Sequence, residues 1–266
     1  MATEVVPSNR ILQALAIHPA GPALKAELRW MDFHSPSDTP LWRQVIGPGA
    51  NVWDHTISFY RHARLFARIE PHLQDPRLKS TFLLGVLSHD FGEAKINGVG
   101  VGDMAWYRRT PESERKEALI AHGIIGQLDL EPPLRQRMSL AHHEVVSGGN
   151  PTLHHAFKAL ERADYVLTAL HVYAMGRMGL VIARSQELIG KVITNDLTRT
   201  ILQFTDHYPR SIGAYFHSVS GTIDSAIASA APYLHSYKDT DAQLKIFTAV
   251  WQDFQGRNPG TRDVTS

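Results

Sequence analysis

Histidine and carboxylate side chains are the residues of this chain that could bind a metal ion and do chemistry with it. The 266 residues include fifteen His and no Cys. The lack of Cys excludes disulfides, thiolate nucleophiles, Cys-type zinc sites and iron–sulfur clusters. A metal ion would therefore be bound by imidazole nitrogens and carboxylate oxygens.

The candidate metal ligands follow one another at intervals along the chain. They are His55, the adjacent pair His89-Asp90, His122, the adjacent pair His142-His143, and Asp164. A divalent ion needs about four to six nitrogen or oxygen ligands, and a mixture of His and Asp suits Mn, Fe, Co, Zn or Ni. In an adjacent His-Asp pair, the imidazole can bind one ion while the carboxylate bridges to a second. We therefore expect two divalent ions.

The elements that must position these ligands are helices. Apolar residues recur at three and four positions through 53–69, 78–88, 114–128 and 153–174, and almost no segment alternates as a strand would. The pattern predicts an all-α protein in which five successive helices each carry a ligand. The segment 78–88 is apolar nearly all round, which is typical of a central helix. His89 and Asp90 should emerge directly from the core.

Several helix boundaries are also predicted. Thr110 as N-cap, Pro111 at the first position and acidic residues in the first turn predict a helix from 111 to about 127. Pro132-Pro133 should begin the next helix, and the Gly-rich segment 147–151 should separate it from the helix that carries Asp164. In the segment 53–69 we expect an inward-facing stripe of Val52, Ile57, Tyr60, Leu65 and Ile69.

The length is sufficient to bury a core without disulfides. We expect an N-terminal helical extension over 1–49, a metal-binding helical core over 50–175, C-terminal helices packed on that core over 176–255, and a flexible polar tail over 256–266.

The charge is balanced, with 27 Lys and Arg against 26 Asp and Glu and a formal net charge of +1. This excludes a strongly cationic arm, and we expect no stable binding of nucleic acid. The N-terminus lacks the pattern of a signal peptide, and no stretch approaches the ~18 apolar residues of a membrane helix. A cytoplasmic protein without membrane contact is the expectation. The oligomeric state is left open.

The ordered ligand set resembles the HD-domain superfamily of metal-dependent enzymes, whose pattern runs His, His-Asp, further His and Asp on a bundle of about five helices. The resemblance covers about residues 50–175. TPESERKEALIAHGIIG and LAHHEVVSGG are most similar to the HD-GYP cyclic-dinucleotide phosphodiesterases, although SGGNP replaces their GYP and HDFGEAK replaces their HD-x-G-K. His89-Asp90-Phe-Gly-Glu93 and Gly102-Asp103 are similar to the HD-type 5'-nucleotidases.

The resemblance implies roles for individual residues. The first ion would be bound by His55, His89, Asp90 and Asp164. The second ion would be bound by Asp90, His122 and His142, and His143 would bind a third ion or the substrate. The catalytic group would be Asp90, Glu93 and Lys95, with Glu93 as acid/base or water-orienting residue. Phosphate would be bound by Lys95, Arg108 and Arg109.

The chemistry that follows is hydrolysis of a phosphoester. Two divalent ions about 3.5–4 Å apart activate a water molecule and hold the phosphoryl oxygens for in-line attack. We expect a small phosphorylated substrate, a nucleotide or a cyclic (di)nucleotide.

Two other function classes stay open. The mixed-valent diiron oxygenases are similar in their ligand pattern and use iron to activate O2, in this case for a small polar substrate. A non-catalytic binding module that keeps the metal for stability is the third class. Dependence on O2 would separate the first two classes, and substrate turnover would separate both from the third.

Overall fold

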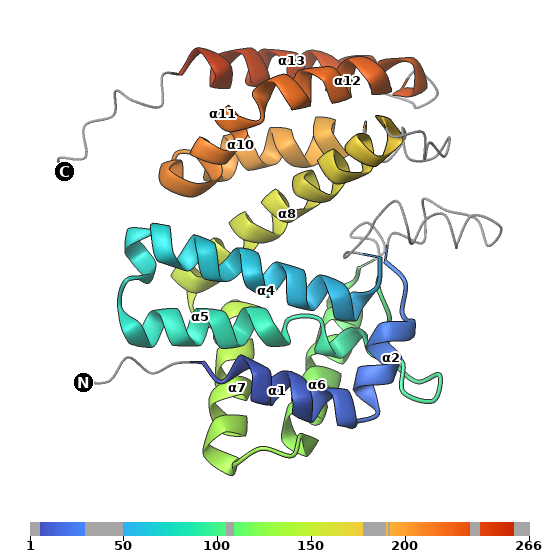
Figure 1. The fold of residues 1–266 in the computed structure, drawn as a ribbon, viewed down its shortest axis with the longest axis vertical. Helices are drawn as coiled ribbons and strands as arrows, with labels where there is room; N and C mark the ends of the chain where they lie inside the picture. The colour runs from blue at the N-terminus through green and yellow to red at the C-terminus, as the bar shows by residue number, and fades with distance from the viewer. Residues whose placement is uncertain are drawn as a thin grey trace. The chain divides into compact units, whose positions relative to one another are not determined.

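The computed structural model describes residues 6–29, 50–104, 109–177, 190, 192–234 and 240–257. Within these ranges the regular structure is helical, and only two isolated bridges, Leu28 with Asn51 and Ile96 with Val99, pair extended residues. The predicted all-α class is therefore confirmed. The chain forms two compact units, Met1–Lys158 and Ala159–Ser266. The division falls within a long helix, α8 (Pro151–Arg177) (Figure 1).

The first unit is built around one central helix, α5 (Pro76–Ser88), which packs between α4 (Val52–Ile69) and α7 (Pro132–Val145) (Figure 1). The remaining elements of the unit are α1 (Ser8–Ile17), α2 (Ala20–Ala26), the 3₁₀ turns η4 (Pro71–Leu73) and η5 (Phe91–Glu93), α6 (Pro111–Gln127) and the start of α8. α6 packs on η5 and on α7.

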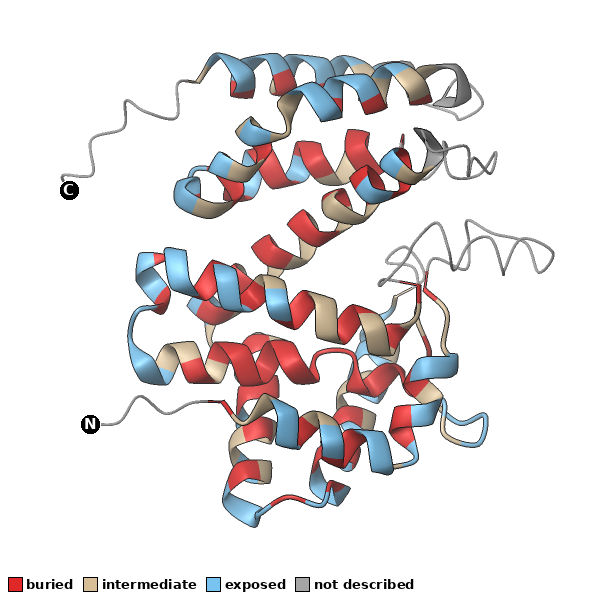
Figure 2. Cartoon of the chain, in the orientation of Figure 1, coloured by how far each residue is buried: buried red, intermediate tan, exposed pale blue. Residues whose placement is uncertain are grey.

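From Phe82 to its end, helix α5 is buried on all sides, as expected from its apolar sequence. Asp75 caps its N-terminus by accepting hydrogen bonds from the amides of Arg77 and Leu78. Every side chain from Phe82 to Ser88 is buried, and α5 is the most continuously buried helix of the unit in Figure 2. The helix therefore ends inside the core, where His89 follows.

The buried stripe of α4 differs in part from the prediction. Val52 and Tyr60 are buried and Ile57 is half-buried, but Leu65 and Ile69 are 56% and 45% exposed. Leu65 follows Tyr60 by five positions, about 140° around the helix, so it leaves the inward face. The buried face is completed by His55, Thr56, Phe59, Ala63, Phe66 and Ala67.

The predicted boundaries of α6, α7 and α8 are confirmed. The Thr110 hydroxyl accepts a hydrogen bond from the Ser113 amide, and the Ser113 hydroxyl accepts one from the Thr110 amide. This capping box satisfies two amides at the start of α6. α7 begins at Pro132, and Gly148, with φ of 84°, turns the chain toward the start of α8 at Pro151.

The second unit has its own apolar core. It consists of the remainder of α8, a π-helical turn η7 (Val192–Leu197), α10 (Thr198–Phe204), a second π-helical turn η8 (Pro209–Gly213), α11 (Ala214–Ser218), α12 (Ser220–Leu234) and α13 (Thr240–Gly256). Phe216, Trp251 and Phe254 pack their rings in this core. The Trp251 indole N–H also donates to Asp224 at 2.6 Å and so links α13 to α12.

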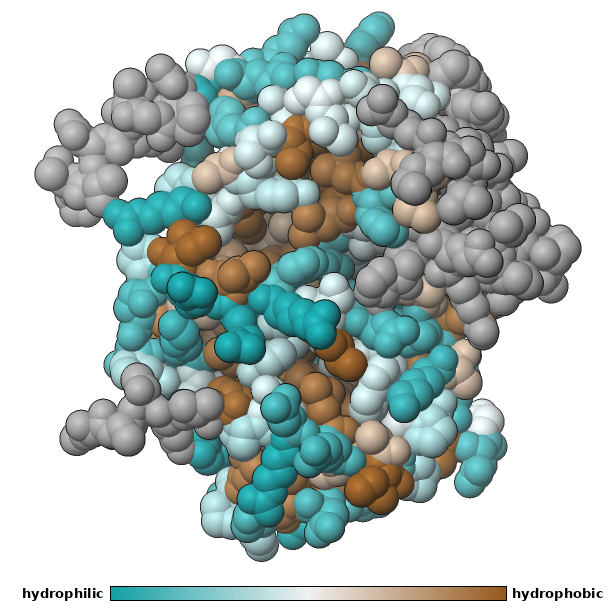
Figure 3. Space-filling model, viewed as in Figure 1, coloured by the Kyte–Doolittle hydropathy of each residue, from teal (hydrophilic) through white to brown (hydrophobic). Residues whose placement is uncertain are grey.

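The surface mixes polar and apolar groups. Figure 3 shows hydrophilic side chains over α4, α5 and α1, with smaller apolar areas between them. None of the helices in the described part of the chain is long and apolar enough to cross a bilayer. The predicted domain limits at residues 49, 175 and 255 stay sequence-based predictions.

Close packing of α5 on α7 leads to a stability prediction at Gly85. A Cβ added there would lie 2.4 Å from the Val145 Cβ and 2.8 Å from the Ala141 carbonyl oxygen. We expect Gly85→Ala to lower the free energy of unfolding by about 1–3 kcal/mol, because two packed helices must separate.

Gly123→Ala is the matched control, since Gly123 is exposed in α6 and an added Cβ would meet nothing within 4 Å. This change should be neutral or should stabilise by up to about 1 kcal/mol. Urea unfolding measures both variants, and an equally stable Gly85→Ala protein would show that the interface is not close-packed.

Candidate metal centre

His55 lies in the first turns of α4, and its position is set by local hydrogen bonding. Asn51 is the N-cap of this helix and accepts a hydrogen bond from the Asp54 amide at 2.8 Å. The bridge between Leu28 and Asn51 ties the same point to the chain just after α2 ends. The imidazole is 7% exposed and stacks on Phe59, one turn later, with ring centroids 5.3 Å apart.

His89 and Asp90 follow the last residue of α5. The His89 Nδ1 lies 2.7 Å from the Val86 carbonyl oxygen. A carbonyl can only accept, so Nδ1 donates this hydrogen bond and Nε2 is the nitrogen left to bind an ion. This hydrogen bond holds the ring in the orientation and tautomer that metal-bound histidines generally have.

Three ligand atoms converge at one buried point. His89 Nε2 lies 3.3 Å from His55 Nε2 and 3.0 Å from Asp90 Oδ2, and His55 Nε2 lies 3.5 Å from Asp90 Oδ2. Atoms bound to one ion at about 2.0–2.2 Å lie about 2.9–3.6 Å apart in tetrahedral or octahedral geometry. The donor set therefore fits a divalent ion, as the sequence predicts for these three residues. In the described part of the chain this is the one group of three whose ligand atoms all lie within 4.8 Å of one another.

Aromatic rings form the wall behind this group. His89 lies 4.7 Å from Phe59 and 5.8 Å from Phe157, measured between ring centroids, and both Phe side chains are fully buried. Rings packed this closely leave the imidazoles little freedom to rotate. The ligand atoms are thus held in place before any ion binds.

The electrostatics of the group favour an ionised Asp90. Burial raises the pKa of this carboxyl, but the adjacent His89 and His55 imidazoles and the Arg29 guanidinium outweigh burial. The resulting pKa lies well below the ordinary value, so Asp90 is a carboxylate at neutral pH. This is the protonation state in which it can bind a cation.

A second pair of imidazoles lies beside the end of α5. The His122 and His142 ring centroids are 5.3 Å apart, and the planes are at 76°. His142 Nδ1 lies 3.3 Å from the Ser88 hydroxyl, and His122 Nδ1 lies 2.6 Å from the Ser139 hydroxyl. In each ring Nδ1 faces a hydroxyl group, so Nε2 is the nitrogen that could bind a metal ion.

Burial also fixes the protonation state of His142. Desolvation, together with the neighbouring His122 and His89, lowers the pKa of His142 to about 4. The ring is therefore neutral at pH 7, as a metal ligand must be. The prediction that Asp90, His122 and His142 share a second ion is compatible with this pair, and it stays a prediction.

His143 lies on the exposed side of α7. Its ring packs against Gly149, where an added Cβ would lie 2.7 Å from His143 Nε2. Desolvation lowers the pKa of His122, and the neighbouring His143 lowers it further. His143 is thus near the second imidazole pair, while its predicted roles stay predictions.

Glu93 is buried next to the metal-binding group, and its two oxygens differ. Oε1 accepts a hydrogen bond from Arg109 at 3.0 Å, whereas Oε2 is buried without a hydrogen-bond partner among the described residues. Burial raises the pKa of Glu93, and the negative charges of Asp90, Asp103 and Glu117 raise it further, against the effect of Arg109. Arg109 also donates to Glu117 at 3.2 Å.

The remaining predicted phosphate-binding residues are Lys95 and Arg108. The Lys95 ammonium is 2.8 Å from a Glu27 carboxylate oxygen, and the side chain is 44% exposed. Arg108 lies outside the described residues.

Asp164 is buried within the second unit. Burial raises the pKa of Tyr215 to about 12, and the negative charge of Asp164 contributes to this shift. Its predicted role as a ligand of the first ion stays a prediction.

Arg29 is a residue of the site that sequence reasoning missed. The residue is 6% exposed, and its charge lowers the pKa of Asp90. It lies in a short extended segment far from the ligands in sequence, and no motif surrounds it. The pairing of Leu28 with Asn51, which is a tertiary contact, brings it to the start of α4.

No protein-family model, no curated protein and no solved structure matches this chain.

Metal content provides the direct check of the group. We expect the double variant His89→Ala/Asp90→Ala to bind a divalent ion at least about tenfold more weakly than the unchanged protein, because two of the three converging ligands are lost. Elemental analysis after dialysis measures this. His72→Ala, which removes an exposed imidazole of η4, should retain full metal content; retention by the double variant would contradict the assignment.

The low pKa of His142 predicts an acid-sensitive stability in metal-free protein. Between about pH 6.5 and 4 the unfolded chain binds a proton at His142 that the folded protein does not, so stability falls as the pH falls. From pH 6.5 to 5 the loss attributable to this residue is about 2 kcal/mol. His142→Gln should remove that part of the pH dependence in urea unfolding, and an unchanged dependence would contradict the low pKa.

Proposed function

We propose that the protein is a metal-dependent phosphohydrolase acting on a phosphoester of a nucleotide or a cyclic (di)nucleotide. The observation that carries the proposal is the convergence of His55 Nε2, His89 Nε2 and Asp90 Oδ2 at one buried point. Divalent ions bound by such ligands act as Lewis acids toward phosphoryl oxygens and lower the pKa of water. Following the HD-domain resemblance, His122 and His142 would hold a second ion with Asp90.

Glu93 is suited to be the proton donor for the leaving oxygen. Its raised pKa keeps the carboxyl protonated closer to neutral pH than an ordinary Glu. Arg109 holds Oε1, so the proton is on Oε2, the oxygen without a hydrogen-bond partner among the described residues. Asp90 stays ionised beside it, so the two carboxyl groups divide the roles of ligand and acid.

The charge of the substrate would be met by buried arginine. Arg29, which is 6% exposed, acts electrostatically on Asp90 and so offers positive charge close to the ligands. A guanidinium can bind a phosphate through two parallel hydrogen bonds. Of the residues predicted to bind phosphate, Lys95 pairs with Glu27, and Arg109 pairs with Glu93 and Glu117, so both are weaker candidates than Arg29.

The experiment is a substrate screen with metal-loaded protein. Nucleoside monophosphates, cyclic nucleotides and cyclic dinucleotides are incubated with Mn²⁺, Fe²⁺, Co²⁺ or Mg²⁺, with and without O2, and released phosphate and monoesters are quantified. We expect hydrolysis that does not depend on O2. His89→Ala/Asp90→Ala should lose at least about a thousandfold in kcat/KM, because the metal is lost, whereas His72→Ala should match the unchanged protein.

Each outcome of the screen decides between function classes. Turnover that stops without O2 and returns with air would replace the hydrolase by the diiron oxygenase. Full metal occupancy without turnover of any phosphoester would contradict the proposal and favour a binding module.

The role of Glu93 is tested by the isosteric change Glu93→Gln. We expect kcat to fall about 10²–10⁴-fold with the metal retained, because the amide cannot donate an acidic proton. The unchanged enzyme should lose rate as the pH rises through the pKa of Glu93, and the variant should lose that limb of the pH profile. Glu117→Gln, which removes the other carboxylate bound by Arg109, should keep the loss of rate at high pH. A Glu93→Gln enzyme with the same pH profile as the unchanged enzyme would exclude Glu93 as the proton donor.

A further inference from the structure

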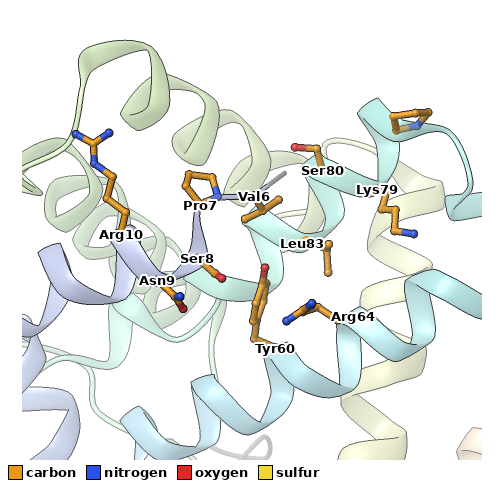
Figure 4. Close-up of a pocket in the computed structure, with 11 residues that line it drawn as sticks. Val6, Pro7, Ser8, Asn9, Arg10, Tyr60, Arg64, Lys79, Ser80 and Leu83 are labelled. Atoms are coloured by element: carbon orange, nitrogen blue, oxygen red, sulfur yellow. The ribbon is translucent and has the colours of Figure 1, made fainter. Parts of the chain in front are cut away.

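A cleft at some distance from the metal centre has the character of a second ligand site. It lies between the first turn of α1, the middle of α4 and the first half of α5, all within the first unit (Figure 4). Its volume is about 610 Å³. Sites for small molecules are typically about 300–1,000 Å³ in volume.

The charged side chains that line the cleft are all basic. They are Arg10, Arg64 and Lys79, and no Asp or Glu is among the eleven lining residues. Arg10 points away from Tyr60 and pairs with Glu131. Arg64 extends from α4 beside Tyr60, and Lys79 extends from α5 next to Leu83 (Figure 4). These two cations give the cleft a positive potential.

The start of α1 adds to this potential. The first turn, which begins at Ser8, has no side-chain cap at Pro7 and contains no acidic residue. Amides at such a helix end carry a partial positive charge and bind anions. Arg64 and Lys79 reach the cleft from two other helices, so three separate elements favour an anion at this place.

The rest of the lining is mainly apolar. Val6, Pro7 and Leu83 contribute aliphatic surface, and the buried Tyr60 contributes its ring. An inorganic anion alone would leave the apolar surface of the cleft exposed to water. A ligand with an anionic head and a short apolar body would satisfy both parts of the cleft.

We propose that this cleft binds a small organic anion, with a phosphate or carboxylate head near Arg64, Lys79 and the start of α1 and an apolar body against Leu83 and Tyr60. The site is separate from the metal centre, because Lys79 and His89 are ten residues apart on and after α5, which corresponds to about 15 Å along the helix. The proposal is independent of the proposed hydrolase function.

Calorimetry with four probes tests the head and the body of the ligand. Hexylphosphonate, which has no P–O–C bond to hydrolyse, and hexanoate carry both parts; inorganic phosphate lacks the body, and hexanol lacks the charge. At about 50 mM salt we expect at least one of the two amphiphilic anions to bind at least about tenfold more tightly than phosphate or hexanol, and to weaken as salt is raised. The tighter of the two identifies the head group.

Variants locate the binding. Arg64→Gln/Lys79→Gln should weaken binding of the tighter probe at least about tenfold, because the two cations that face the head are removed. Arg61→Gln/Arg77→Gln removes the same charge from exposed positions of α4 and α5 outside the cleft and should change affinity less than about twofold. His89→Ala/Asp90→Ala should bind the probe as well as the unchanged protein does.

Four results would overturn the proposal. They are hexanol binding as tightly as the anions, no binding of either anion at millimolar concentration, equal loss in the two charge variants, and loss of binding in His89→Ala/Asp90→Ala, which would assign the anion to the metal centre instead.

Discussion

The burial of α5 is the constraint on which the rest of the first unit depends. Every side chain from Phe82 to Ser88 is enclosed, and Gly85 lets α7 approach where a Cβ would collide with Val145. Because this second half of α5 is packed on all sides, the helix can neither slide nor rotate without breaking many contacts. The C-terminal end of α5 therefore has a fixed position in the core, and His89 and Asp90 lie there, opposite His55 on α4.

In this buried region the pKa values of two neighbouring carboxyl groups, Asp90 and Glu93, shift in opposite directions. Desolvation raises the pKa of both Asp90 and Glu93, but their neighbours differ in charge. Two imidazoles and Arg29 surround Asp90 and keep it ionised. Asp90, Asp103 and Glu117 act on Glu93, and Arg109 compensates for them only in part. The same buried region thus lowers the pKa of Asp90 and raises that of Glu93, three residues away, and the proposed hydrolysis uses this difference.

The parts of the fold that could be predicted from sequence are those governed by local rules. The start of α6 follows from the Thr110 side chain and Pro111, because capping involves only neighbouring residues. The stripe on α4 was predicted only in part, since Leu65 and Ile69 are exposed. The apolar residues of α4 are too numerous for one face of the helix. His55 is also buried, although its polar side chain does not predict a buried position. Which residues of α4 point inward depends on where α5 packs.

The sequence by itself determined the helical class, the central place of α5 and the adjacency of His89 and Asp90, because helical periodicity, capping and chain order are properties of short segments. Only the tertiary structure decided that His55 meets this pair within 3.5 Å, that Arg29 acts on Asp90 and that Arg64 and Lys79 line a cleft with the start of α1. These contacts join segments distant in the chain. They depend on which helix faces pack together, and no local pattern of residues encodes that choice.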